Sequence, residues 1–147
     1  MSAAMGAVLP DGLTQKSTRL ERCVRRAREE YALAADFQHD YSRQDAAILN
    51  VQRACELAID MGNMVIAHEG WELPASAREV FATLHQRRLI DAALAASLAR
   101  MVGFRNLAVH EYESLDMAIV ASVIQRETDA LLHLAGQLLA RYLPPTN

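Results

Sequence analysis

MVGFRNLAVHEY, residues 101–112, is the stretch around which the rest of this chain is organised. It follows one long apolar run and precedes another, and it holds an Arg, an Asn, a His, a Glu and a Tyr. Both flanking runs carry apolar residues at helical spacing, which indicates helices that contribute to a core. The polar side chains of residues 101–112 are therefore the first candidates for chemistry.

The composition predicts a single all-α domain. The chain has 147 residues, enough to bury one core, and 52% of them are hydrophobic. It contains six Gly and four Pro, and only 5% of its residues are aromatic. Because the apolar residues are mostly Ala and Leu, close-packed helices are favoured over a β-sandwich.

The charge balance alone does not predict a nucleic-acid partner. The net charge is −3, so binding RNA would require a local basic patch. All basic residues except Lys16 are Arg, which suits phosphate binding but equally GC-rich coding or surface ion pairs. The cluster of Arg25, Arg26 and Arg28 is interpreted as a solvated helix face rather than an RNA track.

Cysteine usage and hydropathy predict a reduced cytoplasmic protein that binds no metal. Neither Cys23 nor Cys55 is spaced with another Cys or a His as zinc ligands are. Residues 1–13 lack the pattern of a secretory signal. Arg100 and Arg105 interrupt the longest apolar run, so no membrane span is expected.

Capping residues and apolar spacing predict about five helices. These are expected at about residues 17–36, 43–68, 77–86, 91–110 and 116–141. They would form one domain over residues 16–143. Residues 1–15 are expected to be a flexible tail that contains the turn residues Pro10-Asp11-Gly12, and residues 144–147 a short C-terminal tail.

The predicted helix starts rest on side-chain caps. Thr14 or Ser17 would cap the first helix, and Ser42, with Asp45 three residues later, would cap the second. Ser76 would cap the third helix. The second helix is apolar on more than one side, which predicts a central position in the bundle or a dimer interface.

Spacing within residues 101–112 limits which side chains can meet. Arg105 and His110 are five residues apart, which places them about 140° apart around a regular α-helix. Asn106 and His110 are four apart and share a face. Arg105 and His110 can therefore converge only if the helix ends or bends near Val109, or if a second subunit contributes.

The pattern Arg105-x4-His110-x-Tyr112, with Asn106 directly after the Arg, resembles the signature of HEPN-type ribonucleases. The extended run Gly-Phe-Arg-Asn-Leu-x-Val-His-x-Tyr is similar to the HepT toxins of bacterial and archaeal toxin–antitoxin pairs, whose motif has the form R-x4-H-x-Y. Residues 48–60 and 81–90 also resemble HepT helices. The likeness covers roughly residues 17–142.

This resemblance implies a HEPN-like helical bundle that dimerises and cleaves RNA without metal or cofactor, with tRNA as one candidate target. His110 would move protons to or from the ribose oxygens, and Arg105 would hold the scissile phosphate. Asn106 would orient His110 or bind the substrate. The products would be a 2′,3′-cyclic phosphate and a 5′-hydroxyl.

The resemblance also implies regulation by an MntA-like minimal nucleotidyltransferase antitoxin, which transfers AMP to Tyr112. No DNA or membrane partner is expected. An alternative is a non-catalytic helical accessory or substrate-binding subunit of a nucleotidyltransferase. On the residues alone, Arg105 could also be an ion-pair partner of Glu111 or Glu113, and Tyr112 a packing residue.

Overall fold

The computed structural model describes the backbone of residues 2–143 and the side chains of residues 9–143. Its elements are α1 (Ser2–Leu33), η1 (Phe37–His39), α2 (Tyr41–Glu69), α3 (Ala77–Gln86), α4 (Ala92–His110), η2 (Tyr112–Ser114), α5 (Met117–Ser122), η3 (Val123–Glu127) and α6 (Thr128–Tyr142). Within these residues there is no strand, which confirms the predicted all-α class.

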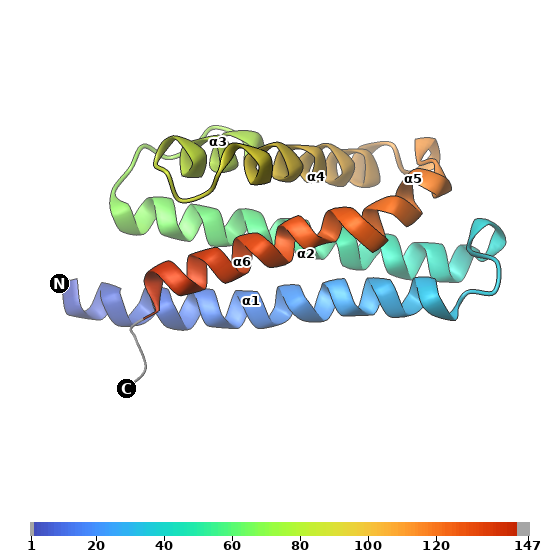
Figure 1. Cartoon of the computed structure of the whole chain (residues 1–147), viewed down its shortest axis with the longest axis horizontal. Coiled ribbons are helices and arrows are strands. Elements are labelled where there is room, and N and C mark those ends of the chain that lie inside the picture. The colour runs from blue at the N-terminus through green and yellow to red at the C-terminus, as the bar shows by residue number, and fades with distance from the viewer. Residues whose placement is uncertain (1, 144–147) are drawn as a thin grey trace.

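The helix α2 is the centre of the bundle. It packs against α1, α3, α4 and α6, and Figure 1 shows it between α1 and the α3–α4 pair, with α6 crossing in front. Its buried side chains include Ile48, Val51, Cys55, Met61 and Ile66. The apolar character on more than one side of α2 is therefore explained by its central position.

The first helix begins earlier than predicted. The expected tail over residues 1–15 is wrong for residues 2–15, whose backbone is helical. Leu9 and Leu13 are buried and extend the apolar face that continues at Leu20. Pro10 removes one backbone donor inside α1, but the burial of two leucines against the bundle offsets that loss. Met1 and the predicted tail at residues 144–147 lie outside the described part of the chain.

The first predicted caps are also corrected. The Thr14 hydroxyl donates to the Pro10 carbonyl inside α1 at 2.9 Å, and Ser17 is buried in the same helix. The N-cap of α2 is Asp40, whose carboxylate accepts from the backbone N–H of Arg43 at 3.0 Å. The turn η1 ends just before Asp40, so α2 starts one residue before Ser42.

The predicted cap of the third helix is confirmed. The Ser76 hydroxyl accepts from the Glu79 N–H at 3.3 Å and begins α3. Asp91 caps α4 through the Leu94 N–H at 2.8 Å. Gly70 ends α2 in the left-handed region, with φ of 73°.

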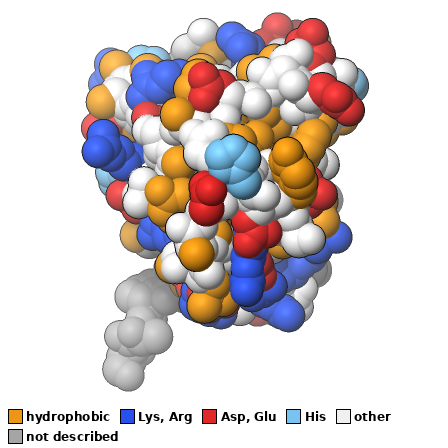
Figure 2. All heavy atoms as spheres, turned by 90° about the vertical axis from the view of Figure 1, so that its right-hand side faces the viewer, with side chains coloured by type: hydrophobic (Ala, Val, Ile, Leu, Met, Phe, Trp, Pro, Cys, Tyr) orange, Lys and Arg blue, Asp and Glu red, His pale blue; other side chains and the backbone are white. Residues whose placement is uncertain are grey.

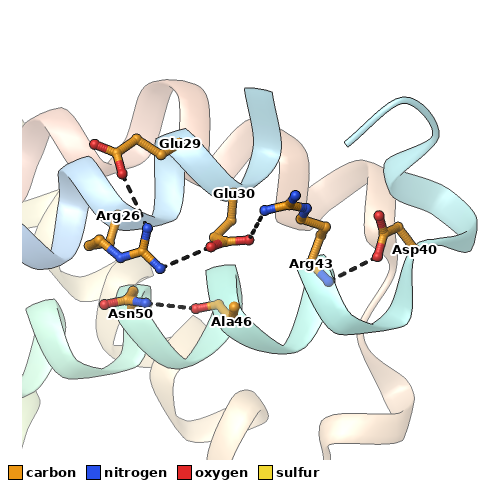
Figure 3. Close-up of polar contacts among 7 residues, drawn as sticks. All are labelled: Arg26, Glu29, Glu30, Asp40, Arg43, Ala46 and Asn50. Atoms are coloured by element: carbon orange, nitrogen blue, oxygen red, sulfur yellow. Dashed lines mark hydrogen bonds and ion pairs between the residues drawn. The ribbon is translucent and has the colours of Figure 1, made fainter. Parts of the chain in front are cut away.

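A buried carboxylate joins α1 to α2, as Figure 3 shows. Glu30 is 8% exposed and accepts from Arg26 Nη2 at 2.9 Å and from Arg43 Nη1 at 2.8 Å. The hydrogen bond from Arg43 is the main reason that the pKa of Glu30 lies below its ordinary value. Because Arg26 and Arg28 both hold carboxylates, they are engaged within the protein and do not form a free basic track.

The helix α4 is, in the described part of the chain, the one helix long and apolar enough to cross a membrane by length and composition. Arg100 and Arg105 do not keep the mean hydropathy of α4 below that of a possible membrane span, contrary to expectation. The apolar side of α4 is part of the core, because Leu94, Leu98 and Met101 are buried in the bundle. Packing of this kind accounts for the hydropathy of α4.

Candidate active site

The motif occupies the end of α4 and the start of η2. Arg105, Asn106 and His110 lie in the last two turns of α4, and His110 is its final residue. Glu111 leaves the helix with φ of −142°, and Tyr112 begins η2. The four predicted site residues are thus on one continuous segment at one end of the bundle.

Arg105 is held between two neighbours. Its Nη1 donates to Asn106 Oδ1 at 3.1 Å, and its Nη2 lies 3.6 Å from Glu56 Oε2 on α2. Glu56 in turn accepts from Gln52 Nε2 at 3.3 Å. The ion-pair partner of Arg105 is therefore Glu56 on α2, and not Glu111 or Glu113 as the alternative had it.

The Nε–H of Arg105 is buried. Its Nε has no hydrogen-bond partner among the described residues, and its side chain is 28% exposed. Cys55 on α2 is buried, with its Sγ 3.7 Å from the carbonyl oxygen of Met101. Burial raises the pKa of the Cys55 thiol to about 12, so this sulfur is a packing group and not a nucleophile.

His110 and Arg105 do not meet within one chain. The helix α4 continues through His110, so the bend near Val109 that would bring the two side chains together is absent from this segment. His110 is exposed, and no hydrogen bond joins it to Arg105 or Asn106 in the described structure. In the single chain, Asn106 therefore orients Arg105 through the hydrogen bond that its Oδ1 accepts and does not orient His110.

Tyr112 is tied to the second helix. Its hydroxyl donates a hydrogen bond to Asp45 Oδ1 on α2, 67 residues away in the sequence. Burial, with the hydrogen bond to Asp45 next, raises the pKa of Tyr112 well above its ordinary value. The sequence analysis missed this role of Asp45, because its position three residues after Ser42 also fits a helix cap.

The surface around the motif is apolar and acidic. Leu49 on α2 is 41% exposed, and Val109 and Tyr112 are 43% and 39% exposed. Figure 2 views the end of the molecule at which α4 finishes, and it shows a histidine among acidic and apolar side chains. No group of three or more His, Cys, Asp or Glu that could hold a metal occurs in the described part of the chain.

Comparison with known sequences places this chain in a family. The model of the family "Ribonuclease HepT-like" matches residues 18–138. The mRNA nuclease HepT of Shewanella oneidensis is 37% identical over 119 residues, which are 81% of this chain and 90% of that protein.

Comparison with solved structures agrees. The tri-AMPylated HEPN toxin of Shewanella oneidensis, in complex with an MNT antitoxin, superposes with a TM-score of 0.84 and 35% identity, over 88% of this chain and 98% of that one. A toxin–antitoxin complex with AMP-PNP gives a TM-score of 0.84 and 34% identity over the same shares. The resemblance predicted from the motif is confirmed, and the chain belongs to the HepT-like family of HEPN ribonucleases.

Proposed function

We propose that this protein is the toxin of a toxin–antitoxin pair and cleaves RNA by a metal-independent reaction in which Arg105 and His110 are the catalytic residues. The observation that carries the proposal is the arrangement at the end of α4. There Asn106 and Glu56 hold the Arg105 guanidinium while His110 is left exposed. Cytoplasmic RNA is accessible to such a protein, and the cytoplasm is its proposed location.

The two side chains supply complementary chemistry. An imidazole can both accept and donate a proton, so His110 takes the proton of a ribose 2′-hydroxyl or protonates the 5′-oxygen that leaves. The Arg105 guanidinium stabilises the charge that develops on the phosphate oxygens. The 2′-oxygen displaces the 5′-oxygen at phosphorus, which yields a 2′,3′-cyclic phosphate and a 5′-hydroxyl.

A homodimer would complete the site. Arg105 and His110 lie on different sides of α4, so one copy does not present both to a single phosphate. A two-fold axis beside α4 would place the His110 of one copy near the Arg105 of the other, because such an interface is self-complementary. The exposed apolar side chains of Leu49 and Val109 are available to that interface.

The RNA class follows from the relatives. The curated relative is named as an mRNA nuclease, so mRNA is the first substrate proposed for this chain, with tRNA as the second. The exposed surface around His110 suits a single-stranded segment, whose phosphate would lie between the His110 of one copy and the Arg105 of the other.

Tyr112 is the proposed site of inactivation. The Shewanella HEPN toxin is tri-AMPylated and bound to an MNT antitoxin, and a nucleotidyltransferase of that type is the partner proposed here. An AMP group on Tyr112 adds bulk and negative charge two residues from His110, and both oppose entry of an RNA phosphate.

The test is induced expression of wild type and His110→Ala in a bacterial host, with total RNA separated on a denaturing gel. Wild type should arrest growth and produce discrete fragments, and His110→Ala should lose both, with cleavage slowed about 100-fold or more. His133→Ala, an exposed histidine on α6, is the matched control and should behave as wild type.

The purified wild-type protein also tests whether cleavage requires a metal ion. Cleavage by the purified protein should be unchanged in EDTA, and a strict requirement for added Mg²⁺ would overturn the metal-independent mechanism. Intact RNA and normal growth with soluble wild-type protein would favour a non-catalytic accessory subunit instead.

A further inference from the structure

The Tyr112 hydroxyl is held by a carboxylate from another helix. Tyr112 follows the end of α4, whereas Asp45 lies in the second turn of α2. Asp45 accepts the hydrogen bond of the hydroxyl, and both side chains are exposed enough for a partner to reach them. The acidic neighbours Glu111 and Glu113 make no hydrogen bond with this hydroxyl in the described structure.

A second tyrosine–carboxylate pair provides an internal comparison. The Tyr142 hydroxyl on α6 donates to Glu69 Oε1 at 3.0 Å. Burial, reinforced by Glu69, raises the pKa of Tyr142 to about 12. Glu69 and Asp45 are 24 residues apart on α2, which corresponds to about 36 Å along a helix. The same chemical pair therefore occurs at both ends of the molecule, and only one of them is beside His110.

Both hydroxyls keep their proton at neutral pH, because the pKa of each is raised. A protonated phenol is a weak nucleophile, and it must lose its proton as it attacks phosphorus. A base within hydrogen-bond reach of that proton provides the loss without a free phenolate. At Tyr112 the group in that position is Asp45.

We propose that Asp45 is the general base for adenylylation of Tyr112, so that the toxin supplies a catalytic group for its own inactivation. This inference rests on the proposed function, in which Tyr112 accepts AMP from ATP. The Tyr112 Oη attacks the α-phosphorus of ATP and its proton passes to Asp45 Oδ1. The bond from the α-phosphorus to the bridging oxygen breaks, and pyrophosphate leaves.

Adenylylation would also change the contact between Tyr112 and Asp45. The modified oxygen has no hydrogen to donate, and its phosphodiester carries a negative charge beside the Asp45 carboxylate. The hydrogen bond between η2 and α2 is lost, and charge repulsion disfavours contact between the adenylyl phosphate and Asp45.

The test measures AMP transfer to the purified full-length chain by its MNT nucleotidyltransferase with ATP and Mg²⁺, followed by intact-mass and peptide mass spectrometry. Asp45→Asn keeps a hydrogen-bond acceptor but cannot take the proton, so its transfer rate should fall about 100-fold or more. The KM for ATP should stay near that of wild type. Asp45→Glu, which restores a carboxylate, should recover part of the rate.

Glu69→Gln is the matched control, because it removes the carboxylate of the other tyrosine pair. It should leave AMP transfer to Tyr112 unchanged. Circular dichroism melting should show that all variants are folded. An Asp45→Asn protein that is modified as fast as wild type overturns the role of Asp45 while Tyr112 remains the acceptor. Wild type that gains AMP on Tyr142, or none at all, overturns the acceptor assignment itself.

Discussion

The Arg28 guanidinium on α1 donates a hydrogen bond from Nε to the carbonyl oxygen of Ile124 in η3, at 3.2 Å. The reason lies in the π-helical turn η3, where the Thr128 N–H bonds to the Val123 carbonyl five residues back. The Ile124 carbonyl thereby loses its usual backbone donor. The Thr128 hydroxyl at 2.8 Å and Arg28 replace it. The single helix predicted over residues 116–141 is therefore interrupted at this turn.

Replacing Arg28 should destabilise the fold at this turn. Arg28→Ala removes the donors to Ile124 and Thr128 and the ion pair with Asp129, and we expect a loss of about 2 kcal/mol in the free energy of unfolding. Chemical denaturation measures it. Arg25→Ala, an exposed neighbour on α1, should cost little, and equal costs for the two variants would contradict the role of Arg28.

The Glu30 carboxylate should make stability depend on pH. Its pKa is lowered in the folded state, so its contribution is complete above the unfolded value of about 4.3. That contribution is lost as the pH falls through the folded pKa. Glu30→Gln should therefore melt at a lower temperature than wild type at neutral pH, and the gap should close in acid.

The control for that titration is Glu29→Gln. Glu29 also bonds Arg26, at 3.2 Å, but its side chain is 47% exposed, and surface ion pairs contribute little. Its melting curves should track those of wild type across the same pH range. A difference in melting temperature between wild type and Glu30→Gln that persists in acid would show that the shape of the Glu30 side chain, and not its charge, explains the effect.

Gly62 on α2 lies against Val80 on α3. A Cβ added there would lie 2.4 Å from Val80 Cγ1, and Gly62 is buried. Gly62→Ala should cost about 1–3 kcal/mol through overpacking. Gly136→Ala is the opposite case, because nothing lies within 4 Å of its added Cβ. It should stabilise α6 by about 0.5–1 kcal/mol. Chemical denaturation should therefore show a lower free energy of unfolding for Gly62→Ala and a higher one for Gly136→Ala.

Arg105 should not tolerate Lys. An ammonium cannot keep the bonds to Asn106 and Glu56 and also hold a phosphate with two donors. We expect Arg105→Lys to lower kcat/KM for RNA about 100-fold. Arg100→Lys, on the exposed side of the same helix at 62% exposure, is the control. Full activity in Arg105→Lys would mean that only the charge of Arg105 is used.

The sequence determined what can be read within one or two helical turns. Ser76 begins a helix as predicted, because a cap and the amide that it accepts from are neighbours in the chain. The spacing of Arg105, Asn106 and His110 already showed that one regular helix does not bring Arg105 and His110 together. The motif likewise identified the family.

Only the tertiary structure decided which side chains meet across helices. The sequence does not connect Tyr112 with Asp45, Arg105 with Glu56, or Arg28 with Ile124, since these pairs depend on how α1, α2, α4 and the last helix pack. Residues 9–15 became helical for the same reason. Pro10 and Gly12 disfavour a helix locally, but Leu9 and Leu13 gain burial against the bundle, and burial outweighs local propensity.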